Sequence, residues 1–288
     1  MSGAAIEVDG HTLTLGNLDK VLYPATGTTK LDVIDYYTKV SVHLLDELAG
    51  RPVTRRRWPN GVDQLSFFEK NVSSGTPDWI TRATLATPGS SRGVETLTFP
   101  VIDSLAALVW HANMAALELH TPQWTVSGAT TSGEITEVHQ PDRLVIDLDP
   151  GPGAGLAECA EVALLVLDRL GGDREAVRPV TSGSKGMQLY ADLGGGADSD
   201  LVRDQVRTLA EGLAGDHPGL VTATMTKSQR VNRVFLDWSQ NSASKTTITP
   251  WSLRGRDLPC VAAPRTWAEV EDAGTLTQLR YEEVLGRL

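Results

Sequence analysis

The chain has 288 residues, a formal net charge of −10 and 41% hydrophobic residues, which is ordinary for a soluble globular protein. The negative charge argues against a protein that coats nucleic acid nonspecifically. No apolar run is long enough to cross a bilayer, and residues 1–10 lack the basic and apolar regions of a signal peptide. The two isolated cysteines, Cys159 and Cys260, form neither a CxxC pair nor a disulfide framework. We therefore expect a cytoplasmic protein with no membrane partner.

Positive charge is nevertheless clustered in two stretches. Arg51–Arg57 holds four arginines and no acid, and Lys227–Arg256 holds six basic residues and one acid, Asp237. An acidic body with two basic clusters fits a focused site for a polyanion. The alternative is that these basic residues pair with surface acids.

The first 50 residues predict a strand pair and a helix. Residues 6–15 alternate like two strands turned at Asp9-Gly10, and the turn-rich loop 16–24 follows and carries Lys20. A helix is predicted from Lys30 to about Ala49, with Thr29 as its N-cap. Tyr37 lies on its apolar face and is expected in the core.

Residues 51–142 give weaker signals. A turn is predicted at Trp58–Gly61, and the extended end of this stretch carries Phe67 and Phe68, of which at least one is expected in the core and the other is available for base stacking. Residues 103–119 predict a mostly buried helix, in which a structural role is expected for His111. The residues alone favour a structural role for His120 too, at the start of an irregular segment. Residues 125–142 are polar and loop-like, and they fit a domain boundary.

From residue 143 the pattern becomes regular. It predicts a strand at 143–149, a helix at about 156–171, strands at about 176–182 and 186–191, a helix at about 199–215, and strands at about 219–225 and 231–238. Helices interspersed with paired strands predict an α+β sheet with helices on one face, the split βαβ or RRM-like arrangement. A doubly wound Rossmann sheet fits less well, because several connections look like hairpins.

The strand at 143–149 carries two acids, Asp147 and Asp149, and ends at the Pro/Gly break 150–153. Side chains alternate along a strand, so both carboxylates project from the same face. Adjacent carboxylates repel, and a divalent cation such as Mg²⁺ or Mn²⁺ resolves that conflict. The alternative is an exposed strand end whose acids are solvated or cap the following helix.

Three further stretches join this pair. The hairpin loop Thr181–Tyr190 offers hydroxyls, backbone N–H groups and Lys185, the composition of an anion nest, although its spacing is not that of a Walker A loop. The strand at 231–238 carries Asp237 among apolar residues, where a metal, a solvated position or a nearby arginine would satisfy it. Three strand-borne carboxylates suit a two-metal site. The stretch 244–256 supplies Lys245, Arg254 and Arg256, and guanidinium groups match phosphate oxygens.

Together, VIDLDPG, TSGSKG and VFLDWSQNSASKTTITPWSLRGR strongly resemble the polymerase domain of bacterial ligase D. That family belongs to the archaeo-eukaryotic primase superfamily and serves nonhomologous end joining. The resemblance spans nearly the whole chain, through NLDKVLYPATGTTK, RRRWPNG, FFEKN, ALELHTPQW and VAAPRTWAE. It implies a primase-polymerase fold in one domain, 1–288, in which an α/β module of about 1–130 with 5′-phosphate-binding elements packs on an RRM-like antiparallel sheet module of about 131–288 with helices.

The resemblance also implies roles for individual residues. The catalytic metal ions, with Mn²⁺ favoured over Mg²⁺ in a two-metal site, would be held by Asp147, Asp149 and Asp237. The incoming nucleotide, preferably a ribonucleotide, would be bound by Arg56, His120, Ser182, Ser184, Lys185, Gln188, Gln240 and Arg254. The 5′-phosphate of the downstream DNA strand would be held by Asn17, Lys20 and Lys30, and the templating base would lie near Phe67 and Phe68. A helix N-terminus at Lys30 is a natural phosphate site.

Two positions depart from the family pattern. The second motif of the superfamily normally ends in histidine, where this chain has Gln188, which donates a hydrogen bond but carries neither charge nor proton. Arg56 stands where relatives often have lysine, which keeps the charge and changes reach and geometry. The first departure puts the turnover rate in question.

The favoured hypothesis is a metal-dependent, template-directed nucleotidyltransferase, a primase-type polymerase that prefers NTPs and fills gaps and extends ends at DNA breaks. The alternative is a catalytically weakened DNA-end-binding or synapsis module that recognises 5′-phosphates; the three retained aspartates argue against it. A DxD glycosyltransferase is a weaker third reading, because Asp237 and the basic clusters do not fit it. By resemblance, the expected partners are DNA with 5′-phosphorylated gaps or breaks, NTP or dNTP, Ku and a DNA ligase.

Overall fold

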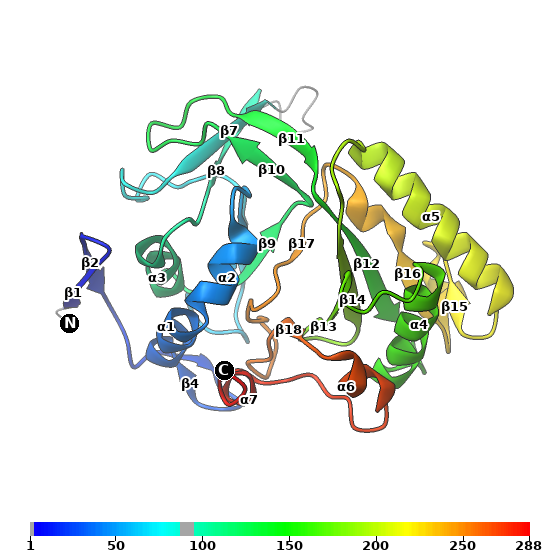
Figure 1. The fold of residues 1–288 in the computed structure, drawn as a ribbon. Coiled ribbons are helices and arrows are strands. Elements are labelled where there is room, and N and C mark those ends of the chain that lie inside the picture. The colour runs from blue at the N-terminus through cyan, green and yellow to red at the C-terminus, as the bar shows by residue number, and fades with distance from the viewer. Residues whose placement is uncertain (1–2, 87–94) are drawn as a thin grey trace. The chain divides into compact units, whose positions relative to one another are not determined.

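The computed structural model describes residues 3–86 and 95–288. The chain divides into two compact units, each drawn from separate stretches of sequence (Figure 1). The first unit contains the residues up to His139 together with Ile248–Cys260 and Arg280–Leu288, and the second contains Gln140–Thr247 and Val261–Leu279. No helix in the described part of the chain is long and apolar enough to cross a membrane.

The second unit is built on a six-stranded sheet in the order β15-β16-β12-β14-β13-β18. Its four central strands pair antiparallel, β16 with β12, β12 with β14, and β14 with β13. The elements of this unit are β12 (Arg143–Pro150), α4 (Leu156–Arg169), β13 (Val177–Thr181), β14 (Met187–Asp192), α5 (Ser199–Asp216), β15 (Val221–Thr222), β16 (Val234–Asp237), β18 (Ala263–Pro264), α6 (Trp267–Glu271) and the 3₁₀ helices η1 (Lys227–Arg230) and η2 (Trp238–Asn241).

This order confirms the predicted fold class. The path β12-α4-β13-β14-α5-β16 puts the first strand between the third and the last, which is the split βαβ, RRM-like arrangement. The two predicted strands at the end are shorter than expected. The prediction of 219–225 shrinks to β15 and that of 231–238 to β16, because η1 and the left-handed Asn232 (φ 55°) separate them and η2 begins at Trp238.

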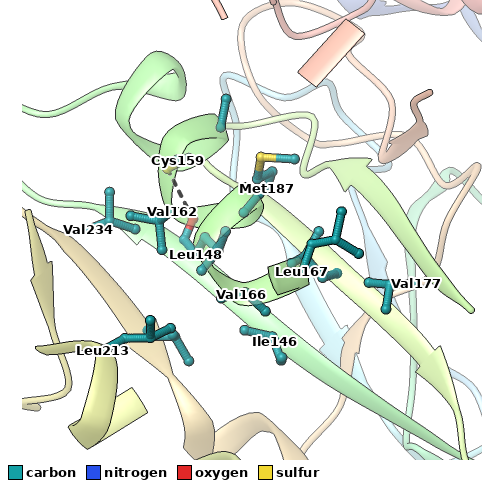
Figure 2. Packing of buried hydrophobic residues seen from close by; sticks show 14 of the residues in the cluster. Ile146, Leu148, Cys159, Val162, Val166, Leu167, Val177, Met187, Leu213 and Val234 are labelled. Atoms are coloured by element: carbon teal, nitrogen blue, oxygen red, sulfur yellow. Dashed lines mark hydrogen bonds between the residues drawn. The ribbon is translucent and has the colours of Figure 1, made fainter. Parts of the chain in front are cut away.

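The core of the second unit lies between one face of this sheet and helices α4 and α5 (Figures 1 and 2). Ile146 and Leu148 of β12 face it, packed with Cys159, Val162 and Val166 on α4. From the neighbouring strands come Met187, Leu189, Val234 and Leu236, and from α5 come Val202, Val206, Ala210 and Leu213. Alternate residues of β12, β14 and β16 therefore point to the opposite face.

The first unit contains the four-stranded sheet β17-β9-β5-β6 and three two-stranded pairs, of which β1 and β2 form the predicted hairpin, turned at Asp9 (φ 48°) and Gly10 (φ 77°). The strand β11 (Glu137–Pro141), which pairs with β10, and the strand β17 (Thr247–Ile248) cross the boundary between the units. The other elements are β1 (Ala4–Val8), β2 (His11–Leu15), β3 (Val21–Tyr23), β4 (Thr28–Thr29), α1 (Lys30–Lys39), α2 (Ser41–Leu48), β5 (Thr54–Arg57), β6 (Phe67–Glu69), β7 (Arg82–Ala86), β8 (Thr96–Pro100), α3 (Leu105–Asn113), β9 (Ala116–Thr121), β10 (Trp124–Ser127) and α7 (Tyr281–Leu285).

The helix predicted at 30–49 begins where expected but is divided into α1 and α2 at Val40. Thr29 caps α1 in a capping box with Asp32, which satisfies N–H groups that the first turn leaves without a partner. Val40 has φ −90° and ψ 3°, and the β-branched residues near it hold a helix poorly. Tyr37 is fully buried, as predicted, and its hydroxyl donates to the carbonyl of Leu117 at 2.7 Å.

The helix predicted at 103–119 is wrong beyond residue 113. α3 ends at Asn113, Ala115 adopts a left-handed conformation (φ 56°), and the chain continues as strand β9. The run Leu117-Glu118-Leu119-His120 alternates apolar and polar residues, and pairing with β5 decides in favour of the strand. The segment 125–142, predicted as loop, contains most of β10 and all of β11.

Candidate active site

Three carboxylates gather on the sheet face opposite the helices of the second unit. Asp147 and Asp149 alternate with the core residues Ile146 and Leu148 along β12, so both project from the other face, as predicted. Asp237 lies directly across from Asp147 on β16. Oxygen atoms of the three side chains lie within 4.8 Å of one another.

Neighbouring polar groups fix Asp237, which is only 9% exposed. One of its oxygens accepts from the backbone N–H of Ser239 at 3.1 Å and from the Ser239 hydroxyl at 2.6 Å. The other accepts from the amide of Gln240 at 3.0 Å. The turn into η2 therefore orients this carboxylate before any ligand binds.

Gln188 lies across from Asp147 on its other side, on β14. Its amide nitrogen donates to Asp147 Oδ1 at 3.1 Å, and its amide oxygen accepts from the hydroxyl of Tyr190 at 3.2 Å. Gln188 is buried and Tyr190 completely so. The position of Gln188 is therefore fixed at both ends, and in this structure it contacts the carboxylate cluster.

The donor set fits a divalent cation. Clustered carboxylates repel one another in a partly buried place, and a cation removes that repulsion. Their oxygens are hard donors of the kind that Mg²⁺ and Mn²⁺ prefer. Asp147, Asp149 and Asp237 are the residues that would hold it.

The loop between β13 and β14 lies at the Asp149 end of the sheet, because Met187 pairs with Leu148. Gly183 has φ 68°, and a Cβ at Gly186 would stand 1.9 Å from the carbonyl oxygen of Leu148. Gly186 therefore requires glycine, and the left-handed backbone at Gly183 favours it.

Gln278 braces this loop from a distant part of the chain. Its amide oxygen accepts from the N–H of Gly183 at 2.7 Å, and its amide nitrogen donates to the carbonyl of Gly186 at 2.8 Å. Ser182 is buried, Ser184 is half-buried and donates its N–H to the Ser182 hydroxyl at 3.3 Å, and Lys185 is exposed. The loop presents Lys185 without an ion pair to any other described residue.

The remaining predicted nucleotide-binding residues lie in the first unit, on β5, on β9 and in the loop after β17. The guanidinium of Arg56 lies 4.7 Å from the ring centre of Trp58, and its Nε donates to the Ser66 hydroxyl at 3.0 Å. His120 and Arg254 both contact Glu118, a residue that the sequence did not single out. His120 lies on a strand and not in an irregular segment.

Glu118 is charged despite its burial. Burial by itself would raise the pKa of the carboxyl, but the hydrogen bond with His120, the Arg254 guanidinium, the charge of His120 and the N–H of Gly255 lower the pKa to about 2. His120 Nε2 lies 2.9 Å from Glu118 Oε2, and the ring of Phe68 packs against His120 at 6.4 Å between ring centres.

The structure brings together the three residues predicted to bind a 5′-phosphate. Asn17 is left-handed (φ 56°) and its carbonyl accepts from the N–H of Lys20 at 3.1 Å. Lys20 Nζ donates to the side chain of Asn60 at 2.9 Å, and Lys30 Nζ to the carbonyl of Gly16 at 2.8 Å. Burial, followed by the charges of Lys20 and Arg57, lowers the pKa of Lys30. Positive charges held this close attract an anion.

The prediction that Phe67 or Phe68 lies in the core is wrong. They are adjacent on the edge strand β6, and their exposed fractions are 53% and 57%. His111, for which a structural role is expected, is completely buried in α3. Its Nδ1 lies 3.4 Å from Arg55 Nη1, and its Nε2 has no hydrogen-bond partner among the described residues.

Sequence reasoning missed four residues that hold the site. Tyr190 and Ser239 each lie two residues from a predicted site residue, so alternation and turn chemistry could have indicated them. Glu118 was hidden by the wrong helix prediction. Gln278 gives no local signal, because it acts on a loop 92 and 95 residues away.

Comparison with known proteins agrees with this geometry. Residues 29–288 match the family model of the LigD primase-polymerase domain. The multifunctional non-homologous end joining DNA repair protein LigD of Mycobacterium tuberculosis is 52% identical over 96% of this chain, and that of Bacillus subtilis, described as bifunctional, is 31% identical over 96%. The chain spans 35% and 42% of the lengths of these relatives.

A solved structure, the polymerase domain from Mycobacterium tuberculosis ligase D in complex with DNA, superimposes with a TM-score of 0.88 at 52% identity and covers 96% of this chain and 93% of that one. Matches of this extent in sequence and in fold establish the relationship expected from the sequence motifs. The chain belongs to the LigD primase-polymerase domain family.

Proposed function

We propose that this chain is a metal-dependent, template-directed nucleotidyltransferase that fills gaps and extends ends at DNA breaks in nonhomologous end joining, with a preference for ribonucleotides. The observation that carries the proposal is the cluster of Asp147, Asp149 and Asp237, whose oxygens lie within 4.8 Å of one another. The family and the DNA-bound relative support the same activity.

The residues of the second unit have separable tasks in this proposal. A bound pair of Mn²⁺ or Mg²⁺ ions would activate the attacking hydroxyl and neutralise the triphosphate. Asp147, Asp149 and Asp237 hold the ions, while Gln188, Ser239 and Gln240 fix two of these carboxylates before the substrate arrives. Ser182, Ser184 and Lys185 on the braced loop bind the phosphates. Such preorganisation supplies much of the rate in phosphoryl and nucleotidyl transfer.

The first unit carries the other predicted contacts. Lys20, Lys30 and Asn17 bind the 5′-phosphate of the downstream strand, and the exposed ring of Phe67 or Phe68 stacks near the templating base. Arg56, His120 and Arg254 bind the nucleotide. In longer relatives this chain corresponds to about a third of the protein, so Ku and a DNA ligase are proposed partners.

The test is single-nucleotide extension on a gapped duplex with and without a 5′-phosphate, comparing GTP with dGTP in Mn²⁺ and Mg²⁺. We expect insertion that depends on the phosphate, favours GTP and is faster in Mn²⁺. Asp147→Asn keeps the side-chain shape and the acceptor for Gln188, and it should reduce insertion about 100-fold or more, a barrier change of several kcal/mol. Asp204→Asn, an exposed acid on α5, is the matched control.

Each outcome separates the two functional classes. Phosphate-dependent binding without insertion in either metal would replace the polymerase by the DNA-end-binding module. Insertion that survives Asp147→Asn unchanged would show that the carboxylate cluster is not the catalytic centre.

A further inference from the structure

Glu118 is a buried acid in the middle of the positive side chains of the first unit. It lies on β9 directly across from Arg56 on β5, and 1% of it is exposed. A buried carboxylate is costly unless charged or polar groups surround it, and here three such groups do so, from His120, Arg254 and Gly255. Its pKa of about 2 keeps it ionised at neutral pH.

The two oxygens of Glu118 serve different partners. Oε2 lies 2.9 Å from His120 Nε2, on the same strand. Oε1 accepts from the backbone N–H of Gly255 at 3.1 Å and lies 3.3 Å from Arg254 Nε, an ion pair whose angle is not that of a hydrogen bond. The Glu118 carboxylate therefore connects His120 with the loop that carries Arg254, and this loop is more than 130 residues away in the sequence.

The same loop continues to the third cation. Gly255 lies against the ring of Trp58, since a Cβ at this position would stand 2.2 Å from ring atoms. The guanidinium of Arg56 also lies against that ring, at 4.7 Å from its centre. A single charge at Glu118 thus holds His120 and Arg254 directly, and Gly255 links it through Trp58 to Arg56.

We propose that Glu118 is the positioning residue of a polyphosphate-binding cluster made of Arg56, His120 and Arg254. The inference rests on the nucleotide-binding function proposed above. Glu118 occupies Nε2 of His120 and the Nε side of Arg254. It therefore leaves the terminal nitrogens of the guanidinium, and Nδ1 of the imidazole in its protonated form, as the donors for phosphate oxygens. In the described structure these atoms have no other ion-pair partner.

The charge balance supports this role. The cluster contains two arginines and one acid, and His120 adds a further positive charge when it is protonated. The cluster therefore keeps a net positive charge that attracts an anion, and Glu118 reduces the repulsion among the cations. If the cluster served only the stability of the fold, a second acid that neutralised the remaining positive charge would stabilise it further. An orienting carboxylate behind a histidine also fixes which ring nitrogen carries the proton.

The test compares Glu118→Gln with Glu69→Gln in the full chain. Glutamine keeps the shape of Glu118, but its NH₂ group must face His120 or the Arg254–Gly255 loop, so the interaction on that side is lost. Glu69 is a matched control, because it is a partly buried acid in the same sheet that pairs with Arg55 and Arg57. The measurements are the affinity for GTP by calorimetry, the affinity for 5′-phosphorylated gapped DNA, and the ¹⁵N resonances of the His120 ring.

We expect Glu118→Gln to weaken GTP binding about tenfold or more, as loss of a charged hydrogen-bond partner implies, and to change the His120 ring resonances. Affinity for the 5′-phosphorylated DNA should stay within twofold, and Glu69→Gln should change neither GTP binding nor the His120 signals. Altered His120 signals with unchanged GTP affinity would overturn the inference, because Glu118 would then be structural only.

A double-mutant cycle keeps the inference testable if Glu118→Gln is unstable. His120→Asn should cost much less GTP affinity in the Glu118→Asp background than in the wild type, and full additivity would overturn the positioning role. Failure of the wild-type chain to bind GTP at all, with the His120 signals intact, would instead overturn the proposed nucleotide-binding function and with it the polyphosphate ligand. These readouts therefore distinguish the two failures.

Discussion

At the residue scale, Gln188 links Tyr190 to a carboxylate of the proposed metal site. Its amide donates to Asp147 and accepts from Tyr190, so both ends of the side chain are used. The resemblance suggested a contact with the nucleotide, and that contact stays a prediction. The observed bonds show a different consequence of having glutamine here, since the amide fixes Asp147 without adding a charge.

We predict that Gln188→Leu lowers the free energy of unfolding by about 1–3 kcal/mol, because it leaves the buried hydroxyl of Tyr190 without its acceptor. Nucleotide insertion should fall as well, because Asp147 loses the donor that orients it. Gln188→His retains a donor and should be more active than Gln188→Leu. Urea unfolding and single-turnover extension measure the two effects. Gln205→Leu, exposed on α5, is the control, and equal behaviour of both leucine variants would contradict the prediction.

At the scale of elements, the β13–β14 hairpin gets its shape from two glycines and from Gln278. Gly186 allows the close approach to Leu148, and Gln278 bonds to the backbone on both sides of Ser184 and Lys185. A loop that must present several donors to phosphates benefits from such bracing, because fewer conformations compete with the binding one.

We predict that Gln278→Ala raises the KM for the nucleotide about tenfold with a smaller change in kcat, since the loop loses two hydrogen bonds of about 1 kcal/mol each. Amide exchange at Gly183 should accelerate. The neighbouring Thr277→Ala removes an exposed side chain and should leave both quantities unchanged. Faster exchange with an unchanged KM would show that the hairpin is not a nucleotide-binding loop.

In the loop that follows β17, the backbone of Gly255 packs so closely on the ring of Trp58 that no side chain fits at this position. Gly255→Ala would place a Cβ 2.2 Å from the ring of Trp58, so we expect the free energy of unfolding to fall by about 1–3 kcal/mol or more as the ring is displaced. Gly215→Ala, near the end of α5 with nothing within 4 Å, should be neutral or stabilise the chain by up to about 1 kcal/mol. Thermal unfolding of the two variants compares them directly, and similar melting temperatures would contradict the packing argument.

At the scale of the whole molecule, the charge of −10 is distributed so that positive groups gather locally. In the first unit they meet at Lys20 and Lys30 and again around Glu118, while the second unit collects three carboxylates. This distribution suits a protein that binds a polyanion at selected places, directly at the positive groups and through a cation at the carboxylates.

Stability should respond to acid in two separate pH ranges. Burial, followed by the charges of Arg55 and Arg57, lowers the pKa of His111 well below its usual 6.5. Below pH 6.5, His111 therefore binds a proton in the unfolded chain but not in the folded chain. The free energy of unfolding should fall as pH drops below 6.5, by up to about 1.4 kcal/mol per pH unit. The contribution of Glu118 is present above pH 4.5 and is lost as pH falls toward about 2.

Urea unfolding at pH 7.5 and 5.5 tests the first range. We expect the free energy of unfolding of the wild type to fall between pH 7.5 and 5.5. It should fall clearly less in His111→Gln, because glutamine does not titrate. His139→Gln, at an exposed histidine, should retain the slope of the wild type. An equal slope for His111→Gln would show that the buried histidine does not control this response.

Much of the second unit could be predicted because its signals are local. The alternation in β12 placed Asp147 and Asp149 on one face, and the hairpin at Gly183–Gly186 follows from turn residues within a few positions. In the first unit the same reasoning failed at residues 114–119, where an apolar run fits a helix and a strand equally well, and pairing with β5 made it a strand.

The sequence by itself determined the α+β class, the three carboxylates and the family, because these depend on local periodicity and on motifs that stay in order. Only the tertiary structure decided which residues hold the site in place. Glu118 reaches Gly255 across 137 positions, and Gln278 reaches Gly183 across 95. The identity of such a pair leaves no periodic trace in the chain, because the contact is made by the packing of strands and loops and not by neighbours in sequence.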